Sequence, residues 1–389
     1  MNGRVIHMRI AKIGRNLAVL LLIAMALSAC SKSGSKVLPY EVAVYDEPTF
    51  EDAGMDARGI FPGRFGAEYG RMLQLDKKRW LAVYTIYDNN GYTSDDRGGT
   101  KLRLSESRDG GTTWEVVTTI SDPGRDLDNG QLIELRNGDL LLACRSVRWQ
   151  ESYRLDVYKS TDQGATWTRL STIDENNGEP GDLGYPDKGV YEPHMGFLED
   201  GRLAVFYANE KHVTEEPSYS QIISEKISDD GGSTWGEEIF AAWDPDNPGA
   251  RPGMPVWTRM KDKRYILTFE VCGTDSCNIH YKISKDAVNW EAGVGTLIPD
   301  QLGGPYIASM PDGTLVVVSN SSHLSVSKDY GQTWHTASQD PWPASLWTSV
   351  YPFGKHQIAV MNSVNRDIGG HDIRIHYMEL PASFLDDDA

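Results

Sequence analysis

An octet of the form Ser-x-Asp-x-Gly-x-Thr-Trp recurs along this 389-residue chain and restricts the folds open to it. It is complete at 107–114, 160–167, 228–235 and 327–334, and a worn copy lies at 284–290. The octet aspartates are 53, 68, 56 and 43 residues apart, a loose period typical of one four-stranded propeller blade. We therefore expect one octet in each structural repeat.

The octet has the chemistry of a tight turn. Ser and Asp side chains bond backbone amides, Gly accepts a positive φ, and Trp fills the space between neighbouring sheets. Carboxylates placed identically in every repeat are expected to be structural and not catalytic. The octets resemble the Asp-box (BNR) repeat of the sialidase-like superfamily, and the resemblance covers most of the chain after about residue 60.

Apolar hairpins give an independent count of the repeats. Six pairs of short apolar strands joined by polar turns start at Met72, Leu132, Met195, Pro255, Tyr306 and Trp347. Five continue into a third strand, an octet and a fourth strand, whereas the sixth ends after 373–378. Segment 40–45 is the expected missing strand, because it would close the ring. The sequence predicts an all-β, six-bladed β-propeller with Asp-box turns over 38–380, followed by an acidic tail at 381–389.

The amino-terminal 30 residues have the pattern of an export signal. Four basic and no acidic side chains occur among the first 29 residues, an apolar run covers 17–26, and Cys30 follows Leu-Ser-Ala. This resembles a bacterial lipoprotein signal in which Cys30 is lipidated, with 31–37 as a flexible tether. The apolar run is short for an uncleaved span. We expect a lipid-anchored protein of the bacterial cell envelope, in the periplasm or at the outer membrane or cell surface.

The net charge limits the classes of binding partner, and the cysteine positions limit the possible disulfides and metal sites. The net charge of −17 disfavours nucleic acid, which requires a basic surface. Cys272 and Cys277 flank a hairpin turn and could pair, whereas Cys144 lies in an apolar strand and is expected to be a buried thiol. No zinc site is expected, since neither Cys144 nor the Cys272/Cys277 pair has a matching His pair. We also expect no other metal and no organic cofactor. We expect a monomer that contacts the membrane only through its lipid.

The geometry of a propeller determines which residues can meet to form an active site. The starts of first strands and the ends of second strands share one face of the central channel, opposite the Asp-box turns. On that face Glu192 precedes a proline, and Glu270 ends an apolar strand of the next blade. Two such carboxylates can flank one glycosidic bond, at ~5 Å for retention or ~6.5–9.5 Å for inversion. Further candidates at this face include Glu68, Tyr69, Asp128, Gln131, Met254, Asn320 and Asn362.

A narrower resemblance rests on four segments: Tyr191-Glu192-Pro193, 207–210, 251–256 and 269–272. In that order they look like glycoside hydrolase family 93, the exo-α-1,5-L-arabinanases, which release arabinobiose from linear arabinan with retention. The resemblance implies that Glu192 is the nucleophile and Glu270 the acid/base. The positions at the channel face and this resemblance together predict a substrate-binding set of Arg71, Asp88, Asn129, Arg145, Tyr191, His194, Glu210, Arg251, Tyr306 and Trp347, with Trp149 as a further stacking candidate.

Two other functions stay open at this stage. Sialidases share the octets and blade count, but they require three arginines, a tyrosine nucleophile and an acid Asp. The first blade reads Tyr69-Gly70-Arg71 where sialidases have Arg-Ile-Pro, and Tyr351 points toward the far face. A non-catalytic, glycan-binding propeller lipoprotein would carry the same repeats without needing the paired glutamates. Exact sugar, exo or endo action, and membrane leaflet stay undetermined.

Overall fold

The structure, a computed structural model, describes residues 38, 40–45, 66–87, 100–365, 371–381 and 384. The chain divides into two compact units, Met1–Leu38 and Pro39–Ala389, and the fold below is that of the second unit. The described strands form six four-stranded antiparallel sheets, joined by loops and a single 3₁₀ turn. The prediction of an all-β, six-bladed β-propeller is confirmed.

Each blade uses its strands in chain order from the inner to the outer edge. Blade one contains β2 (Gly66–Gln74), β3 (Trp80–Tyr87), β4 (Thr100–Ser107) and β5 (Glu115–Ile120), and blade two contains β6 (Asp126–Glu134), β7 (Leu140–Arg148), β8 (Ser152–Ser160) and β9 (Thr168–Asn177). Blade three contains β10 (Val190–Phe197), β11 (Leu203–Asn209), β12 (Ile222–Ser228) and β13 (Ile239–Ala242), with η1 (Lys211–Thr214) after β11. Blade four contains β14 (Arg251–Arg259), β15 (Tyr265–Cys272), β16 (Asn278–Ser284) and β17 (Thr296–Leu302). Blade five contains β18 (Tyr306–Ser309), β19 (Leu315–Val318), β20 (Leu324–Ser327) and β21 (His335–Ser338).

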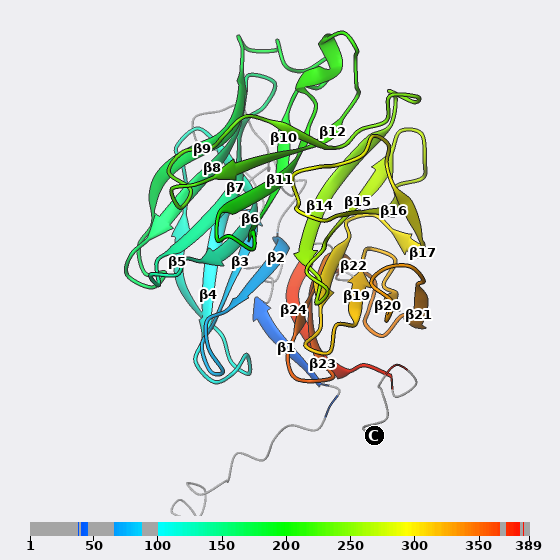
Figure 1. Cartoon of the computed structure of the whole chain (residues 1–389). Helices are drawn as coiled ribbons and strands as arrows, with labels where there is room; N and C mark the ends of the chain where they lie inside the picture. The colour runs from blue at the N-terminus through cyan, green and yellow to red at the C-terminus, as the bar shows by residue number, and fades with distance from the viewer. Residues whose placement is uncertain are drawn as a thin grey trace, which may run out of the picture. The chain divides into compact units, whose positions relative to one another are not determined.

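The sixth blade closes the ring with a strand from the other end of the chain. It contains β22 (Ser345–Pro352), β23 (Gln357–Asn365), β24 (His371–Glu379) and, outermost, β1 (Tyr40–Tyr45). Figure 1 shows the blue β1 beside the red β24. Inner strands β2, β6, β10, β14, β18 and β22 each contact the next, and β22 contacts β2. The predicted closure by 40–45 is confirmed, and it covers the edge of β24.

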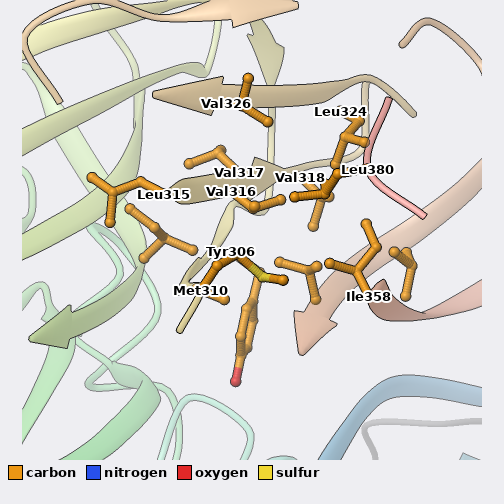
Figure 2. Packing of buried hydrophobic residues seen from close by; sticks show 14 of the residues in the cluster. Tyr306, Met310, Leu315, Val316, Val317, Val318, Leu324, Val326, Ile358 and Leu380 are labelled. Carbon is orange, nitrogen blue, oxygen red and sulfur yellow. The ribbon is translucent and has the colours of Figure 1, made fainter. Parts of the chain in front are cut away.

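The apolar cores lie between neighbouring blades. In β7, Leu140 and Leu142 pack with blade one, while Leu141 and Ala143 pack with blade three. Successive strand residues point to opposite faces, so a sheet covered on both sides requires a continuous apolar run. Figure 2 shows the corresponding cluster of blade five around Val316 and its neighbours, with the Tyr306 phenol pointing out of it.

The five octets form the expected turns. In the second octet, Ser160 Oγ accepts from the Gly164 amide at 2.8 Å, and Asp162 accepts from the Thr166 amide at 2.9 Å and from its hydroxyl. The Thr166 hydroxyl and amide lower the pKa of Asp162 to about 2. Trp167 Nε1 donates to the Gly164 carbonyl at 3.0 Å. The octet carboxylates are therefore engaged in holding their own turns.

The remaining sequence-based expectations fall into two groups. Cys272 and Cys277 form a disulfide, and Cys144 is a buried free thiol. The signal at 1–30 with Cys30, the tether at 31–37, Asp88 and most of the acidic tail lie outside the described residues. Within the described part of the chain, no helix has the length and apolar character needed to cross a membrane.

Candidate active site

One pocket of about 460 Å³ lies where the inner strands begin and their partners end. Its lining combines carboxylates, amides, two arginines and aromatic rings. The lining residues are Glu68, Tyr69, Asp128, Asn129, Arg145, Trp149, Asp187, Tyr191, Glu192, Glu210, Gln221, Arg251, Glu270, Cys272 and Trp347. No octet residue is among them, so the pocket and the Asp-box turns use different parts of each blade.

A left-handed residue recurs at the mouth of every blade. These residues have φ between 50° and 58°, and they are Tyr69, Asn129, Glu192, Met254, Gly304 and Trp347. In five blades the ladder between the first two strands shifts register at this point, as in a β-bulge. In blade five, β18 begins two residues after Gly304. A bulge re-aims a side chain; four of the six residues line the pocket.

The two predicted catalytic glutamates reach the pocket from adjacent blades. Glu192 is the left-handed residue of β10, and Glu270 stands opposite Gly253 near the end of β15. A Cβ placed on Gly253 would lie 3.6 Å from Glu270 Oε1 and 3.7 Å from Glu192 Oε2. Laid end to end, those two distances keep the oxygens within about 7.3 Å of each other. Both carboxylates can therefore contact one small group.

Backbone amides from the following blade orient both carboxylates. The Met254 amide donates to Glu192 Oε2 at 2.7 Å, and the Gly304 amide donates to Glu270 Oε2 at 2.7 Å. Both donors are left-handed residues of the ring described above. The packing of blade against blade thus fixes the direction in which each carboxylate points.

Burial raises the pKa of both glutamates, and the charge of Glu270 adds to the shift of Glu192. Desolvation and then the charge of Glu270 raise the pKa of Glu192 to about 7, despite the Met254 amide. Desolvation also raises the pKa of Glu270, opposed by the Gly304 amide. Two carboxylates this close do not both ionise easily, so the pair retains one proton toward neutral pH. One proton donor and one anion side by side suit acid-assisted substitution.

Glu210 anchors the blade-three side of the pocket. Its buried carboxylate accepts from the Gly189 amide at 3.0 Å, from the Tyr191 hydroxyl at 2.8 Å, and from Arg251. Arg251 also donates to Gln221 Oε1 at 2.9 Å. With these partners, Glu210 holds Tyr191 and Arg251 in place next to Glu192.

A second ion pair lies on the blade-two side. Arg145 Nη2 is 2.9 Å from Asp128 Oδ2, and the other oxygen of Asp128 accepts from the Thr85 hydroxyl and the Asn129 amide. The Arg145 guanidinium lies 5.3 Å from the Tyr191 ring centroid and lowers the pKa of Glu192, although less than burial raises it. Arg145 and Asn129 thereby face the pocket in fixed positions.

Three predicted substrate-binding residues do not line the pocket: Arg71, His194 and Tyr306. Each follows the left-handed residue of its strand by two positions, which carries it farther along the channel. There the Arg71 guanidinium lies 3.9 Å from the Tyr69 ring and 5.2 Å from that of Tyr306, and Arg71 donates to the Trp347 carbonyl at 2.9 Å. His194 packs edge-on against Tyr306 at 5.7 Å.

The other sequence-based candidates divide as follows. Asn129, Arg145, Tyr191, Glu210, Arg251 and Trp347 line the pocket together with Glu192 and Glu270, and Asp88 lies outside the described residues. Sequence reasoning missed Asp187 and Gln221, which belong to loops before β10 and β12 and not to strand ends. Among the described residues, no group of three His, Cys, Asp or Glu side chains is placed to hold a metal ion.

Comparison with known proteins places the fold. No protein-family model matches the sequence. The glycoside hydrolase family 93 α-L-arabinofuranosidase of Fusarium graminearum, solved with arabinobiose, superposes with a TM-score of 0.71 at 20% identity, over 88% of this chain and 98% of that one. The chain shares its fold. The α-L-arabinanase of Penicillium chrysogenum, also solved with arabinobiose, gives 0.70 at 20% identity over 89% and 99%.

More distant matches agree on the propeller. The NanB sialidase of Streptococcus pneumoniae gives a TM-score of 0.59 at 12% identity, over 92% of this chain and 72% of that one. A curated sequence, the vacuolar protein sorting/targeting protein 10 of Schizosaccharomyces japonicus, is 24% identical over 253 residues. That alignment covers 64% of this chain but spans only 15% of the relative's length. Family 93 enzymes and sialidases are thus both among the structural neighbours.

Proposed function

We propose that this protein is an exo-acting, retaining glycoside hydrolase that releases arabinobiose from linear arabinan. The observation that carries the proposal is the pair Glu192 and Glu270, within about 7.3 Å of each other in one pocket, with both pKa values raised. Structural likeness to an α-L-arabinofuranosidase and an arabinanase, each solved with arabinobiose, supports the choice of sugar.

The proposed reaction uses each carboxyl group once in each step. Glu270 protonates the glycosidic oxygen while the Glu192 carboxylate attacks the anomeric carbon, and the bond to the leaving sugar breaks. Glu270 then takes a proton from water, which attacks the same carbon and regenerates Glu192. The upper bound of about 7.3 Å between Glu192 Oε2 and Glu270 Oε1 includes the ~5 Å of retaining enzymes and excludes most of the ~6.5–9.5 Å of inverting enzymes.

The division of labour rests on the family resemblance. The two pKa shifts do not rank the roles, because a coupled pair titrates as a unit and shares its proton. Azide distinguishes the roles: rescue of a Glu192→Gly variant should give the β-arabinosyl azide, and rescue of Glu270→Gly the α-anomer. The reverse pattern of products would exchange the roles of the two residues.

The charges of the pocket favour a neutral sugar over a sialoside. Six carboxylates line it, Glu68, Asp128, Asp187, Glu192, Glu210 and Glu270, against two arginines, Arg145 and Arg251. Both arginines already pair with carboxylates, and Arg71 lies outside the lining. A substrate carboxylate would meet like charges without three converging arginines.

Anchoring at the cell envelope is a further part of the proposal. It is supported by the sequence pattern of 1–30 alone, with Cys30 as the lipidated residue. Envelope fractions of a host cell should retain the full chain and lose a Cys30→Ser variant. Equal retention of both proteins would contradict a lipid anchor.

Product analysis tests the activity. The body lacking residues 1–30 should be incubated with linear arabinan and, separately, with a sialoside, and the released sugars identified. Arabinobiose as the first product is the expected outcome. Free sialic acid would favour the sialidase alternative, and no release from either substrate would favour a glycan-binding role.

A further inference from the structure

A wall at the pocket mouth carries two strongly exposed aromatic side chains. Trp149 is 43% exposed and Tyr185 is 93% exposed. Every other Trp, Tyr and Phe side chain for which the structure describes burial is buried or half-buried. Exposed rings are costly in water, and their concentration at one place marks a binding surface more often than chance exposure does.

The two rings belong to segments that are tied to each other. Trp149 lies in the turn 149–151 between β7 and β8, and Tyr185 lies in the loop 178–189 between β9 and β10. The amides of Gly181 and Leu183 both donate to the Gln150 carbonyl at 3.1 Å. Residue 184 also touches the Gln150 side chain, since a Cβ there would lie 2.6 Å from its Cδ. We call the two segments together the rim wall.

The rim wall is fixed in place and not merely in contact. The Gly178 amide donates to the Glu151 carbonyl at 2.9 Å, and Asn176 donates to the Lys188 carbonyl at 2.8 Å. Leu183 is buried in the core between blades two and three. A surface that is ordered before its ligand arrives loses little conformational entropy on binding.

An aromatic path leads from the rim wall to the catalytic pair. Trp149 lies 6.3 Å from Tyr153, and Tyr153 lies 5.7 Å from Tyr191, measured between ring centroids. Tyr191 immediately precedes Glu192. Trp149 and Asp187, one from each segment of the rim wall, both line the pocket. The rim wall is therefore continuous with the pocket surface.

We propose that Trp149 and Tyr185 form a platform for the part of a linear glycan that lies outside the pocket. Sugar rings present C–H faces that pack on aromatic rings, while Tyr and Trp keep a polar group for the hydroxyls. Because only a long chain reaches the platform, the protein should cleave long chains more efficiently than short oligosaccharides. This inference rests on the proposed function, because it takes linear arabinan as the chain.

Chain-length kinetics test the platform. The values of kcat/KM are measured for linear arabino-oligosaccharides of three to eight residues with the wild type, Trp149→Ala, Tyr185→Ala and the double variant. Each substitution should lower kcat/KM for the octamer by about 3–10-fold, mainly through KM, and lower that for the trimer by less. Trp149→Phe should recover most of the loss. Val116→Ala, 57% exposed on β5 and outside the pocket lining, should change nothing at any length.

The outcomes separate the platform from the activity. A length dependence that survives the double variant, or a wild type with no length dependence, would overturn the platform and leave the activity standing. If the wild type cleaves none of the oligosaccharides, affinity electrophoresis in soluble linear arabinan decides. Retardation that the double variant abolishes would support the platform, and absence of retardation in the wild type would overturn it.

Discussion

Gly253 shows how one missing side chain shapes the reaction space. It pairs with Glu270 across β14 and β15, and a Cβ added to it would lie 3.6 Å from Glu270 Oε1 and 3.7 Å from Glu192 Oε2. Its φ is not positive, so the position does not require glycine for backbone reasons. The space in which a Cβ would sit is bounded by Glu192, Glu270 and the Gln221 amide at 2.8 Å. Glycine therefore keeps this space open to a substrate.

Gly253→Ala should lower kcat/KM on arabinan by about 10²-fold, because a displacement of the order of 1 Å at the reacting atoms has that effect. The fold should persist, since only the end of the Gln221 side chain needs to move. Steady-state kinetics and a thermal melt give both quantities. Full turnover with an intact fold would contradict a substrate position between the carboxylates.

The raised pKa of Glu192 should make the stability of the fold depend on pH. Its pKa of about 7 in the fold exceeds the 4.5 of the free group, so the folded state binds more protons between those values. Stability therefore falls as pH rises through that window. Glu192→Gln removes this loss and should raise the free energy of unfolding by on the order of 1–2 kcal/mol at pH 8, with little change at pH 4. Denaturant melts at both pH values check the prediction; equal effects at both would refute it.

Much of the fold, but less of the site, could be predicted from residues alone. Octets and hairpins located every blade, and segment 40–45 matched β1 because the sixth blade lacked an outer strand. Five inner strands were placed too late, as with β6, which begins at Asp126 and not at Leu132, whereas β18 begins at Tyr306 as expected. Polar pocket residues and the bulge interrupt the apolar pattern there. The same bulge moves residues such as His194 out of the pocket, which counting along a regular strand does not anticipate.

At the scale of elements, the two ends of each blade have separate tasks. The octet turn satisfies its own polar groups and fills the gap between sheets with its tryptophan. The left-handed bulge at the opposite end of the blade presents pocket side chains and amide donors. Its backbone conformation costs about 1–2 kcal/mol for each residue other than glycine. Left-handed residues other than glycine also occur in three octet turns, at Gln163, Ala287 and Tyr330, where the hydrogen bonds of the octet itself hold the turn.

Asp162→Ala should separate these tasks. It removes the acceptor of the Thr166 amide and hydroxyl and of the Ser160 hydroxyl, so the thermal midpoint should fall by a few degrees. Turnover of arabinan well below the midpoint should stay within about twofold of the wild type, as the octet is outside the pocket. A large loss of kcat at unchanged stability would show that octet carboxylates take part in chemistry.

At the scale of the whole propeller, ring closure by β1 supports a site built from several blades. Tyr40 stacks on Tyr377 at 4.8 Å, and Val42 and Val44 are buried in the last blade. Glu192 and Glu270 are held by amides of blades four and five, so their separation depends on how the blades pack. Any loosening of the ring should therefore reach the pocket.

Truncation tests this dependence. Removal of residues 1–45 exposes the edge of β24 and should lower the thermal midpoint, promote aggregation and reduce activity together. Removal of residues 1–37 leaves β1 and serves as the matched control, with unchanged melting and kinetics. Identical melting of the two truncated proteins would show that β1 contributes nothing to closure.

The most direct test of the catalytic pair is the turnover of linear arabinan by Glu192→Gln and Glu270→Gln, with Glu225→Gln as control. Glu225 of blade three is also buried, but it accepts a hydrogen bond from the Trp290 indole N–H of blade four and lies outside the pocket. Each pocket variant should lose about 10²–10⁴-fold in kcat while the control keeps wild-type turnover. Undiminished turnover in either pocket variant would contradict the account.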